Sequence, residues 1–260
     1  MKIGVCIKQV PDTETKIRIN ESRDWISEEG IKFVINPYDE YALEEGIKAK
    51  EKFGGEVVTI TIGPKRCQEA IRSALAMGAD RSVHVVYDDY KLDPLSISKI
   101  LKEVVKKEGI ELVFMGKQAI DNDYSEVGPM LSQMLNWACG NVVTKIDFSV
   151  DGKVLTVERE SLGGDKEIHE LKIPAVVTAA KGLNNPRYPS LKGIMGAKKK
   201  EIKEFTLSDL GLSEASAKST LVLGNLRLPP ERKGGKVIDG DAGEAARKLS
   251  ELLRNEAKVL

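Results

Sequence analysis

The sequence is poor in the residues that build metal, redox and disulfide sites. Its 260 residues include only three cysteines and two histidines. Cys6, Cys67 and Cys139 are odd in number and far apart, so we expect reduced thiols, with no disulfide framework and no zinc site. His84 and His169 are too few for most metal sites or catalytic triads, and we expect both to be structural or surface residues. The sequence therefore predicts no metal centre.

The chain also lacks an excess of charge and a long apolar run. Lysine plus arginine, and aspartate plus glutamate, number 40 each, so we expect no general attraction to nucleic acid or to an acidic membrane. No apolar run approaches the roughly 18 residues of a membrane-spanning helix. The first residues, MKIGVCIKQV, are typical of a core strand and too short in apolar length for a signal peptide. We expect a soluble cytoplasmic protein that binds no nucleic acid and inserts in no membrane.

Two common nucleotide-binding fingerprints are missing. The chain contains neither the GxGxxG pattern of dinucleotide-binding domains nor the GxxxxGK[ST] pattern of P-loop proteins. A classical dehydrogenase and a P-loop NTPase both lose support for this reason.

Strands and helices alternate over the first ~140 residues. We expect helices over 36–55, 64–80, 93–109 and 124–136, and strands over 2–8, 56–63, 82–87 and 111–115. Such alternation predicts an α/β fold, Rossmann-like, whose parallel sheet is covered by helices on both faces. Between the first strand and the first helix, residues 16–20 and 31–35 alternate in polarity and predict an excursion shaped as a hairpin.

The pattern changes from about residue 141. Strands joined by turns are expected over 141–150, 153–160, 167–173 and 175–180, and we expect an added antiparallel hairpin region. Residues 182–205 have little periodicity and predict an extended arm, and a last helix covers 243–258. We divide the chain into an α/β domain, 1–182, and a segment with the arm and the last helix, 183–260.

The loop GKQAIDNDYSEV (116–127) is the main candidate for a binding site. It is longer than a strand-to-helix connection requires, and it leaves the carboxyl edge of the sheet, where ligands of open α/β sheets bind. Gly116 permits close approach of a ligand, while Ser125 and the amides of 124–127 suit a phosphate at a helix start. The aspartates Asp121 and Asp123, and the more distant Asp12, weigh against a bare anion. From residue types alone, a ligand site and a solvated loop stay open.

The arm and the strands before it supply further candidates. Leu191, Ile194 and Met195 are apolar residues without an expected helix or strand to bury them, and a basic run follows at 198–200. An apolar knob beside charge suits protein recognition, and folding of the arm over its own core is the open alternative. The charged triplet 158–160 precedes a glycine turn and is typical of solvent-facing strand residues.

Six segments resemble one known family in order along the chain. They are VCIKQVPD, INPYDEYALEEG, GPKRCQEAIRSALAMGADR, GKQAIDNDYSEVGPMLSQML, VERESLGGDKEIHELKIPAVVTA and NNPRYPSLKGIMGAKKK. Together these segments resemble the β subunit of electron transfer flavoprotein over nearly the whole chain. The resemblance implies an adenine nucleotide alpha hydrolase-like fold without hydrolysis. It also implies a heterodimer with an α subunit that holds most of the FAD, and an AMP held by this chain. In these terms 1–182 would be the nucleotide-binding α/β domain, and 183–260 would be a partner-recognition loop with a C-terminal arm that packs on the α subunit.

The resemblance also implies site residues. The AMP site would comprise Cys6, Asn36, Pro37, Tyr38, Asp39, Ile62, Gly116, Lys117, Gln118, Ala119, Ile120, Asp121, Asn122, Asp123, Tyr124, Ser125, Glu126 and Val127. The recognition loop for partner dehydrogenases would comprise Arg187, Tyr188, Leu191, Ile194, Met195, Lys198 and Lys199, with Leu191 as its apolar anchor. Glu160 matches an acid that helps the flavin domain swing by exchanging salt-bridge partners.

The implied function is that of a non-enzymatic electron carrier. Electrons would pass from dehydrogenases, such as those for acyl-CoA, through the flavin to electron transfer flavoprotein–quinone oxidoreductase and the quinone pool. The expected location is the cytoplasm, or the mitochondrial matrix in a eukaryote.

The motifs also leave two alternatives open. Pro11-Asp12-Thr13, residues 38–41 and residues 127–129 are more similar to the electron-bifurcating branch, which uses NADH and holds a second FAD in the AMP position. Apart from the resemblance, a stand-alone nucleotide-binding sensor is the other alternative. The long C-terminal arm argues against the sensor, because an arm without a partner must order itself at ~1–2 kcal/mol per residue of backbone entropy.

Overall fold

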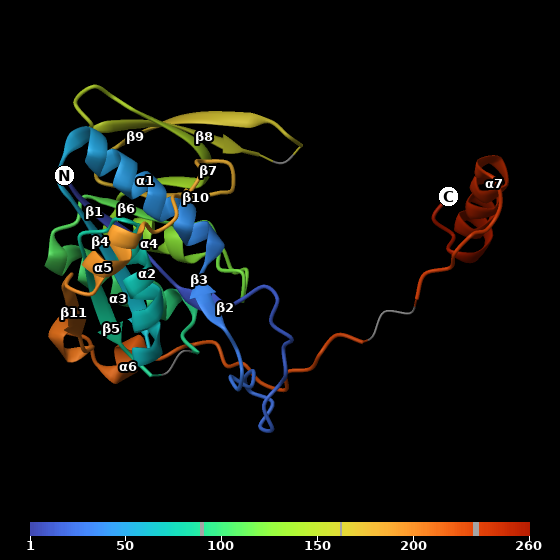
Figure 1. The fold of residues 1–260 in the computed structure, drawn as a ribbon, viewed down its shortest axis with the longest axis horizontal. Coiled ribbons are helices and arrows are strands. Elements are labelled where there is room, and N and C mark those ends of the chain that lie inside the picture. Colours follow the sequence, from blue (N-terminus) through green and yellow to red (C-terminus); the bar gives the residue numbers. More distant parts are fainter. Residues whose placement is uncertain (89–90, 162, 231–233) are drawn as a thin grey trace. The chain divides into compact units, whose positions relative to one another are not determined.

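A computed structural model describes residues 1–88, 91–161, 163–230 and 234–260. The chain forms two compact units, Met1–Gly224 and Asn225–Leu260. The first unit is built on a nine-stranded sheet in the order β11-β5-β4-β1-β6-β10-β7-β8-β9 (Figure 1). The strands are β1 Lys2–Cys6, β4 Glu56–Gly63, β5 Arg81–Val86, β6 Leu112–Gly116, β7 Ala138–Phe148, β8 Val154–Glu160, β9 Lys166–Lys172, β10 Ala175–Ala179 and β11 Ile202–Phe205.

Helices cover both faces of this sheet, which confirms the predicted α/β fold. One face carries α1 (Pro37–Phe53), α2 (Gln68–Met77) and α5 (Leu191–Ala197), and its core includes Leu43, Leu75 and Phe114. The opposite face carries α3 (Pro94–Glu108), α4 (Val127–Leu135) and α6 (Glu214–Ala217). Short helical turns follow β4 at Lys65–Cys67 and β11 at Ser208–Leu210.

Local chemistry places the ends of the helices close to the predicted positions. Pro37 and Pro94 stand in the first turns of α1 and α3, where their missing N–H groups cost nothing. The Asp93 carboxylate caps α3 by accepting from the Ser96 N–H at 2.8 Å. Gly109 ends α3 in the left-handed conformation.

Two expected pairings of strands were wrong. Residues 16–20 form only an isolated bridge between Ile19 and Ile26, and β3 (Phe33–Ile35) pairs instead with β2 (Gln9–Pro11). The β10 strand does not join an antiparallel region, because it lies between β6 and β7 and is parallel to both. Its five residues are all buried, as expected of a strand covered on both faces. The β7-β8-β9 ribbon is antiparallel as predicted, although residue 162, in the predicted turn, lies outside the described residues.

The expected extended arm is partly helical and partly a strand. Residues 191–197 form α5, whose start is capped by the Ser190 hydroxyl accepting from the Gly193 N–H at 3.0 Å. Residues 202–205 form β11, which adds to the edge of the sheet beside β5. Helix α5 packs on α2, and Ala197 is buried in the core of that face. The arm therefore folds on its own unit. Its packing on α2 and its pairing with β5 stabilise the helix and the strand that its weak periodicity did not predict.

The second unit contains α7 (Ala242–Glu251) followed by a π-helical turn, Leu252–Glu256. None of the residues of α7 is buried. Lys236 and Glu256 form an ion pair at 2.7 Å within this unit. The functional division predicted at residue 182 stays a prediction. Within the described residues, no helix is both long enough and apolar enough to cross a membrane.

Candidate functional site

The strand order brings most of the predicted nucleotide residues to one rim. Strands β4, β1 and β6 are neighbours and parallel, so their carboxyl ends lie together. Cys6, Ile62 and Gly116 stand at these three ends. Helix α1 begins with Pro37, directly after β3. This carboxyl edge, where parallel sheets bind ligands, is called the rim below.

Asp39 connects the elements of the rim by hydrogen bonds. Its Oδ2 accepts from the Lys8 N–H at 2.8 Å, and its Oδ1 accepts from the Gly116 N–H and the Asn36 amide, both at 2.9 Å. The first turn of α1 is thereby joined to the ends of β1 and β6. Burial raises the pKa of Asp39 to about 7, against the opposing effect of its hydrogen bonds. A Cβ on Gly116 would come within 2.6 Å of Tyr38 Cβ, so only glycine permits this close approach.

Asn36 joins the start of α1 to the loop that follows β6. It occupies the N-cap position of α1, but its side chain makes no capping bond. The side-chain amide donates to Gln118 O at 2.9 Å, and Oδ1 accepts from the Ile120 N–H at 3.2 Å. Asn36 is buried and holds the 116–120 backbone against α1. A distant loop outcompetes the local cap for its hydrogen bonds.

The two aspartates of the loop have partners inside the chain. Asp121 forms an ion pair with Lys8 at 2.7 Å, and Asp123 accepts from the Gln118 amide at 2.6 Å. Asp12 pairs with Lys32 at 2.9 Å, away from the loop. These partners neutralise or occupy the carboxylates that weighed against an anionic ligand.

Helix α4 begins at Val127, three residues later than predicted. Asp123 and Ser125 have φ angles of 52° and 57°, which a right-handed helix cannot contain. The Ser125 hydroxyl donates to Lys117 O at 2.9 Å and closes the loop. Glu126 makes no side-chain cap, and within the described residues no acceptor is found for the N–H groups of 124–127. A helix start with open N–H groups is a ready anion site.

Apolar and aromatic side chains complete the rim. Cys6, Ile62 and Val127 are partly buried and pack against the same core cluster on the α3–α4 face. Burial, followed by the nearby Asp39 carboxylate, raises the pKa of the Cys6 thiol, so Cys6 is a packing group and no nucleophile. The Lys117 ammonium lies 5.2 Å from the centre of the Tyr38 ring. The rim therefore combines open N–H groups at the start of α4 with apolar side chains from β1, β4 and α4.

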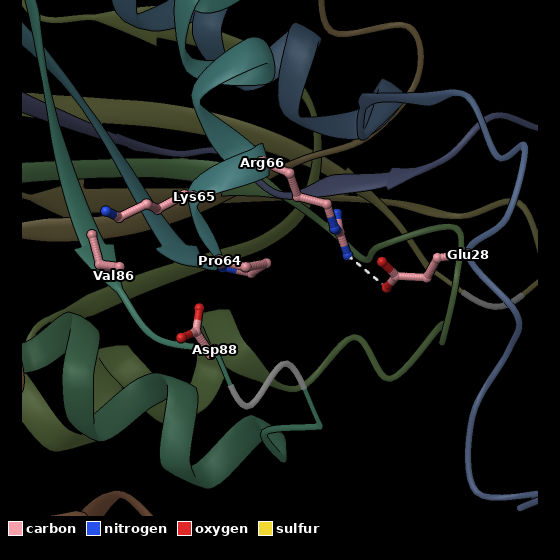
Figure 2. Close-up of a pocket in the computed structure, with 6 residues that line it drawn as sticks. All are labelled: Glu28, Pro64, Lys65, Arg66, Val86 and Asp88. Atoms are coloured by element: carbon pink, nitrogen blue, oxygen red, sulfur yellow. Dashed lines mark hydrogen bonds and ion pairs between the residues drawn. The ribbon is translucent and has the colours of Figure 1, made fainter.

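A cavity of about 420 Å³ lies beside the rim, after β4 and β5 (Figure 2). Its lining residues are Glu28, Pro64, Lys65, Arg66, Val86 and Asp88. Arg66 forms one wall, because its guanidinium donates to Gln9 at 2.7 Å, pairs with Glu28 at 3.0 Å and stacks 3.9 Å from the Phe33 ring. Sequence reasoning missed Arg66 and also Lys8. Lys8 follows β1 and Arg66 follows β4, so both lie after the carboxyl end of a strand. This position was the signal in the sequence that could have indicated them.

The predicted recognition residues form a separate group before, on and directly after α5. Tyr188, Leu191 and Met195 are 94%, 81% and 69% exposed, and Ile194, Lys198 and Lys199 are also exposed. Arg187 differs from the rest, because Glu44 and Glu51 of α1 pair with it. Glu160 is exposed at the end of β8. Within the described residues, no cluster of three or more possible metal ligands occurs.

Comparison with known proteins identifies the family. Residues 24–210 match the family described as the electron transfer flavoprotein domain. The chain is 40% identical over 262 residues to the electron transfer flavoprotein subunit beta of Bacillus subtilis, with both chains fully covered. It is 40% identical over 243 residues to the human subunit beta, covering 92% of this chain and 93% of the human protein. It is also 39% identical over 261 residues to the mitochondrial subunit beta of Arabidopsis thaliana, again with both chains fully covered. The chain therefore belongs to the electron transfer flavoprotein β-subunit family.

Proposed function

We propose that the chain is the β subunit of a heterodimeric electron carrier that pairs with an α subunit and binds AMP at the rim. The observation that carries the nucleotide part is the uncapped start of α4, beside a loop that Asp39 and Asn36 hold in place. The full-length similarity to electron transfer flavoprotein β subunits supports the carrier part.

The rim residues fit the parts of an adenylate. The N–H groups of 124–127 would hold the phosphate, where the positive end of the α4 dipole adds to their effect. Cys6, Ile62 and Val127 offer an apolar surface to the base, and the backbone of 36–39 lies beside them through the Asp39 contacts. This chain supplies no acid, base or nucleophile in this proposal. The nucleotide is a structural ligand that binds the native state and therefore stabilises it by mass action.

The FAD would lie mostly on the α subunit and would accept electrons from a dehydrogenase and pass them to a quinone reductase. This chain would contribute the docking surface for the dehydrogenase, formed by Tyr188, Leu191, Ile194 and Met195, with Lys198 and Lys199 beside it. Exposed apolar side chains ringed by charge suit an interface with a partner. Glu160 would exchange salt-bridge partners as the flavin domain moves. We place the carrier in the cytoplasm, or in the mitochondrial matrix of a eukaryote.

Counting the bound nucleotides tests the proposal. The chain is co-expressed with its α subunit, and the nucleotides released from the purified heterodimer are quantified. One FAD and one AMP per heterodimer are expected. Two FAD and no AMP would instead indicate an NADH-dependent electron-bifurcating protein. A stable monomer that binds ATP and forms no heterodimer would indicate a stand-alone sensor.

A further inference from the structure

The segment between β10 and β11 is fastened to the helices beneath it at both ends. At its start, the Asn184 amide donates to Glu45 and to Tyr41 O, both at 2.9 Å. These acceptors belong to α1. The exposed residues Tyr188 and Leu191 follow directly, so their position depends on how residues 184–187 are held.

Arg187 is the strongest of these fastenings. Its Nε and Nη2 donate to the two carboxylate oxygens of Glu44 at 2.8 and 2.9 Å, and its backbone N–H donates to the same carboxylate at 3.1 Å. Nη1 and Nη2 also donate to Glu51 at 2.6 and 3.0 Å. A guanidinium has five N–H donors, and these contacts occupy most of them. Most of the hydrogen-bonding capacity of Arg187 is therefore used within the chain, although its side chain remains 36% exposed.

The burial of Glu44 decides how this contact works. The Glu44 side chain is only 7% exposed, so it lies out of reach of a docking partner. A buried carboxylate needs a paired cation to remain ionised at low cost. Glu44 and Arg187 therefore hold each other, and a two-point fork fixes the direction as well as the distance.

A second fastening holds the other end of α5. The Arg72 guanidinium donates to Ala197 O at 2.6 Å and to Lys200 O at 2.8 Å. The Lys200 ammonium donates to Leu75 O at 2.9 Å and to Ala79 O. Burial lowers the pKa of Lys200, unlike a freely solvated lysine. Hydrogen bonds of cationic side chains therefore hold the segment at both ends. Arg187 binds α1 at the start, and Lys200 and Arg72 connect the end to α2 and the residues after it.

We propose that Arg187, through the buried Glu44, is a positioning residue that holds Tyr188 and Leu191 in their docking geometry and does not itself touch the partner. The inference rests on the docking role proposed above for this segment. A segment that is already ordered loses less entropy on binding. Loosening it lowers the fraction of molecules that are ready to dock, and the apparent affinity falls by that fraction.

The test uses three single variants in the full heterodimer. Arg187→Gln removes the cation, whereas Glu44→Gln keeps Arg187 and removes only its buried partner. Glu103→Gln, a partly exposed carboxylate on α3 on the opposite face of the sheet, is the matched control. Electron transfer is measured with an acyl-CoA dehydrogenase as the probe. We expect Arg187→Gln and Glu44→Gln each to raise the apparent KM for the carrier about three- to tenfold with kcat unchanged, and Glu103→Gln to change neither.

Leu191→Ala separates this inference from the proposed function. Because Arg187 is proposed to act through both Tyr188 and Leu191, the double variant of Leu191→Ala with Glu44→Gln is expected to raise the KM by less than the product of the two single effects, since coupled residues are not additive. A raised KM in Arg187→Gln with a normal KM in Glu44→Gln would show that Arg187 does not act through Glu44 and would overturn the inference. Normal KM values in both, with a raised KM in Leu191→Ala, would overturn it as well.

Amide hydrogen exchange of residues 188–197 gives a readout that needs no partner. Faster exchange in both Arg187→Gln and Glu44→Gln, with Glu103→Gln unchanged, is the expected result. Unchanged exchange would overturn the inference whatever the kinetics show. If Leu191→Ala has no kinetic effect, the docking role fails, and the exchange measurement alone decides whether Arg187 positions the segment.

Discussion

At the scale of single residues, Asp39 links the fold to the candidate site. One carboxylate receives N–H groups from the ends of two strands and from its own helix turn. Removing it would leave two partly buried backbone donors without these acceptors, each at a cost of up to about 1–3 kcal/mol. The same burial that makes these bonds effective also penalises the charge, and the raised pKa of Asp39 follows from it.

The raised pKa predicts an unusual pH dependence. The folded pKa of about 7 lies above the unfolded value of about 3.9, so the folded state binds the proton more tightly. The contribution of Asp39 to stability is greatest below about pH 4 and falls as the pH rises to about 7, by roughly 1.4 kcal/mol per pH unit at most. We expect Asp39→Asn to be less stable than the parent at pH 5 and to lack this decline. Urea unfolding at several pH values measures both, and parallel profiles would contradict the prediction.

The sequence predicted where Asn36 lies but not which groups it binds. A helix start was predicted at Asn36, and local residues are enough for such a prediction because a helix start depends on its immediate neighbours. The residues that Asn36 binds, Gln118 and Ile120, lie more than 80 residues away in sequence. A cap and a loop contact use the same amide, and only the folded arrangement decides between them.

At the scale of elements, α5 shows how tertiary contacts override a weak local pattern. The helix has seven residues, two of them glycines, and such a short helix is marginal in water without packing. A Cβ on Gly193 would lie 2.3 Å from Ala76 O, whereas a Cβ on Gly196 would meet nothing within 4 Å. Gly193 therefore permits α5 to lie close against α2, and Gly196 has no such role. One of the two glycines of α5 is therefore required by its packing against α2.

Two alanine substitutions in α5 test this reading. Gly193→Ala is expected to push α5 away from α2 and to destabilise the unit by about 1–3 kcal/mol. Gly196→Ala is expected to be neutral, or to stabilise by up to about 1 kcal/mol through helix propensity. Denaturant unfolding and amide exchange of 191–197 measure the two effects. Equal results for the two variants would mean that the close approach does not hold α5.

At the scale of the whole molecule, the alternation of strands and helices was enough to predict a parallel sheet covered on both faces. Strands β1, β4, β5 and β6 and helices α1, α2 and α3 lie close to their expected ranges. The place of β10 was not predictable in the same way, because its residues AVVTA fit any strand buried on both faces. After the β7-β8-β9 ribbon the chain returns and places β10 between β6 and β7. This position buries all five β10 side chains, and it depends on the assembled sheet and not on the local sequence.

The C-terminal unit, Asn225–Leu260, has an exposed helix whose stability can be tested. Helix α7 spans ten residues without a buried side chain, and Leu249, Val259 and Leu260 are exposed. A helix of this length is marginal in water, so we expect residues 242–256 to exchange their amide hydrogens rapidly in the chain alone and slowly in the heterodimer. The buried α3 residues Ile100 and Val104 are the internal control, with slow exchange in both states. Rapid exchange of 242–256 in the heterodimer would mean that the α subunit does not cover this unit, and slow exchange in the chain alone would mean that the unit orders itself.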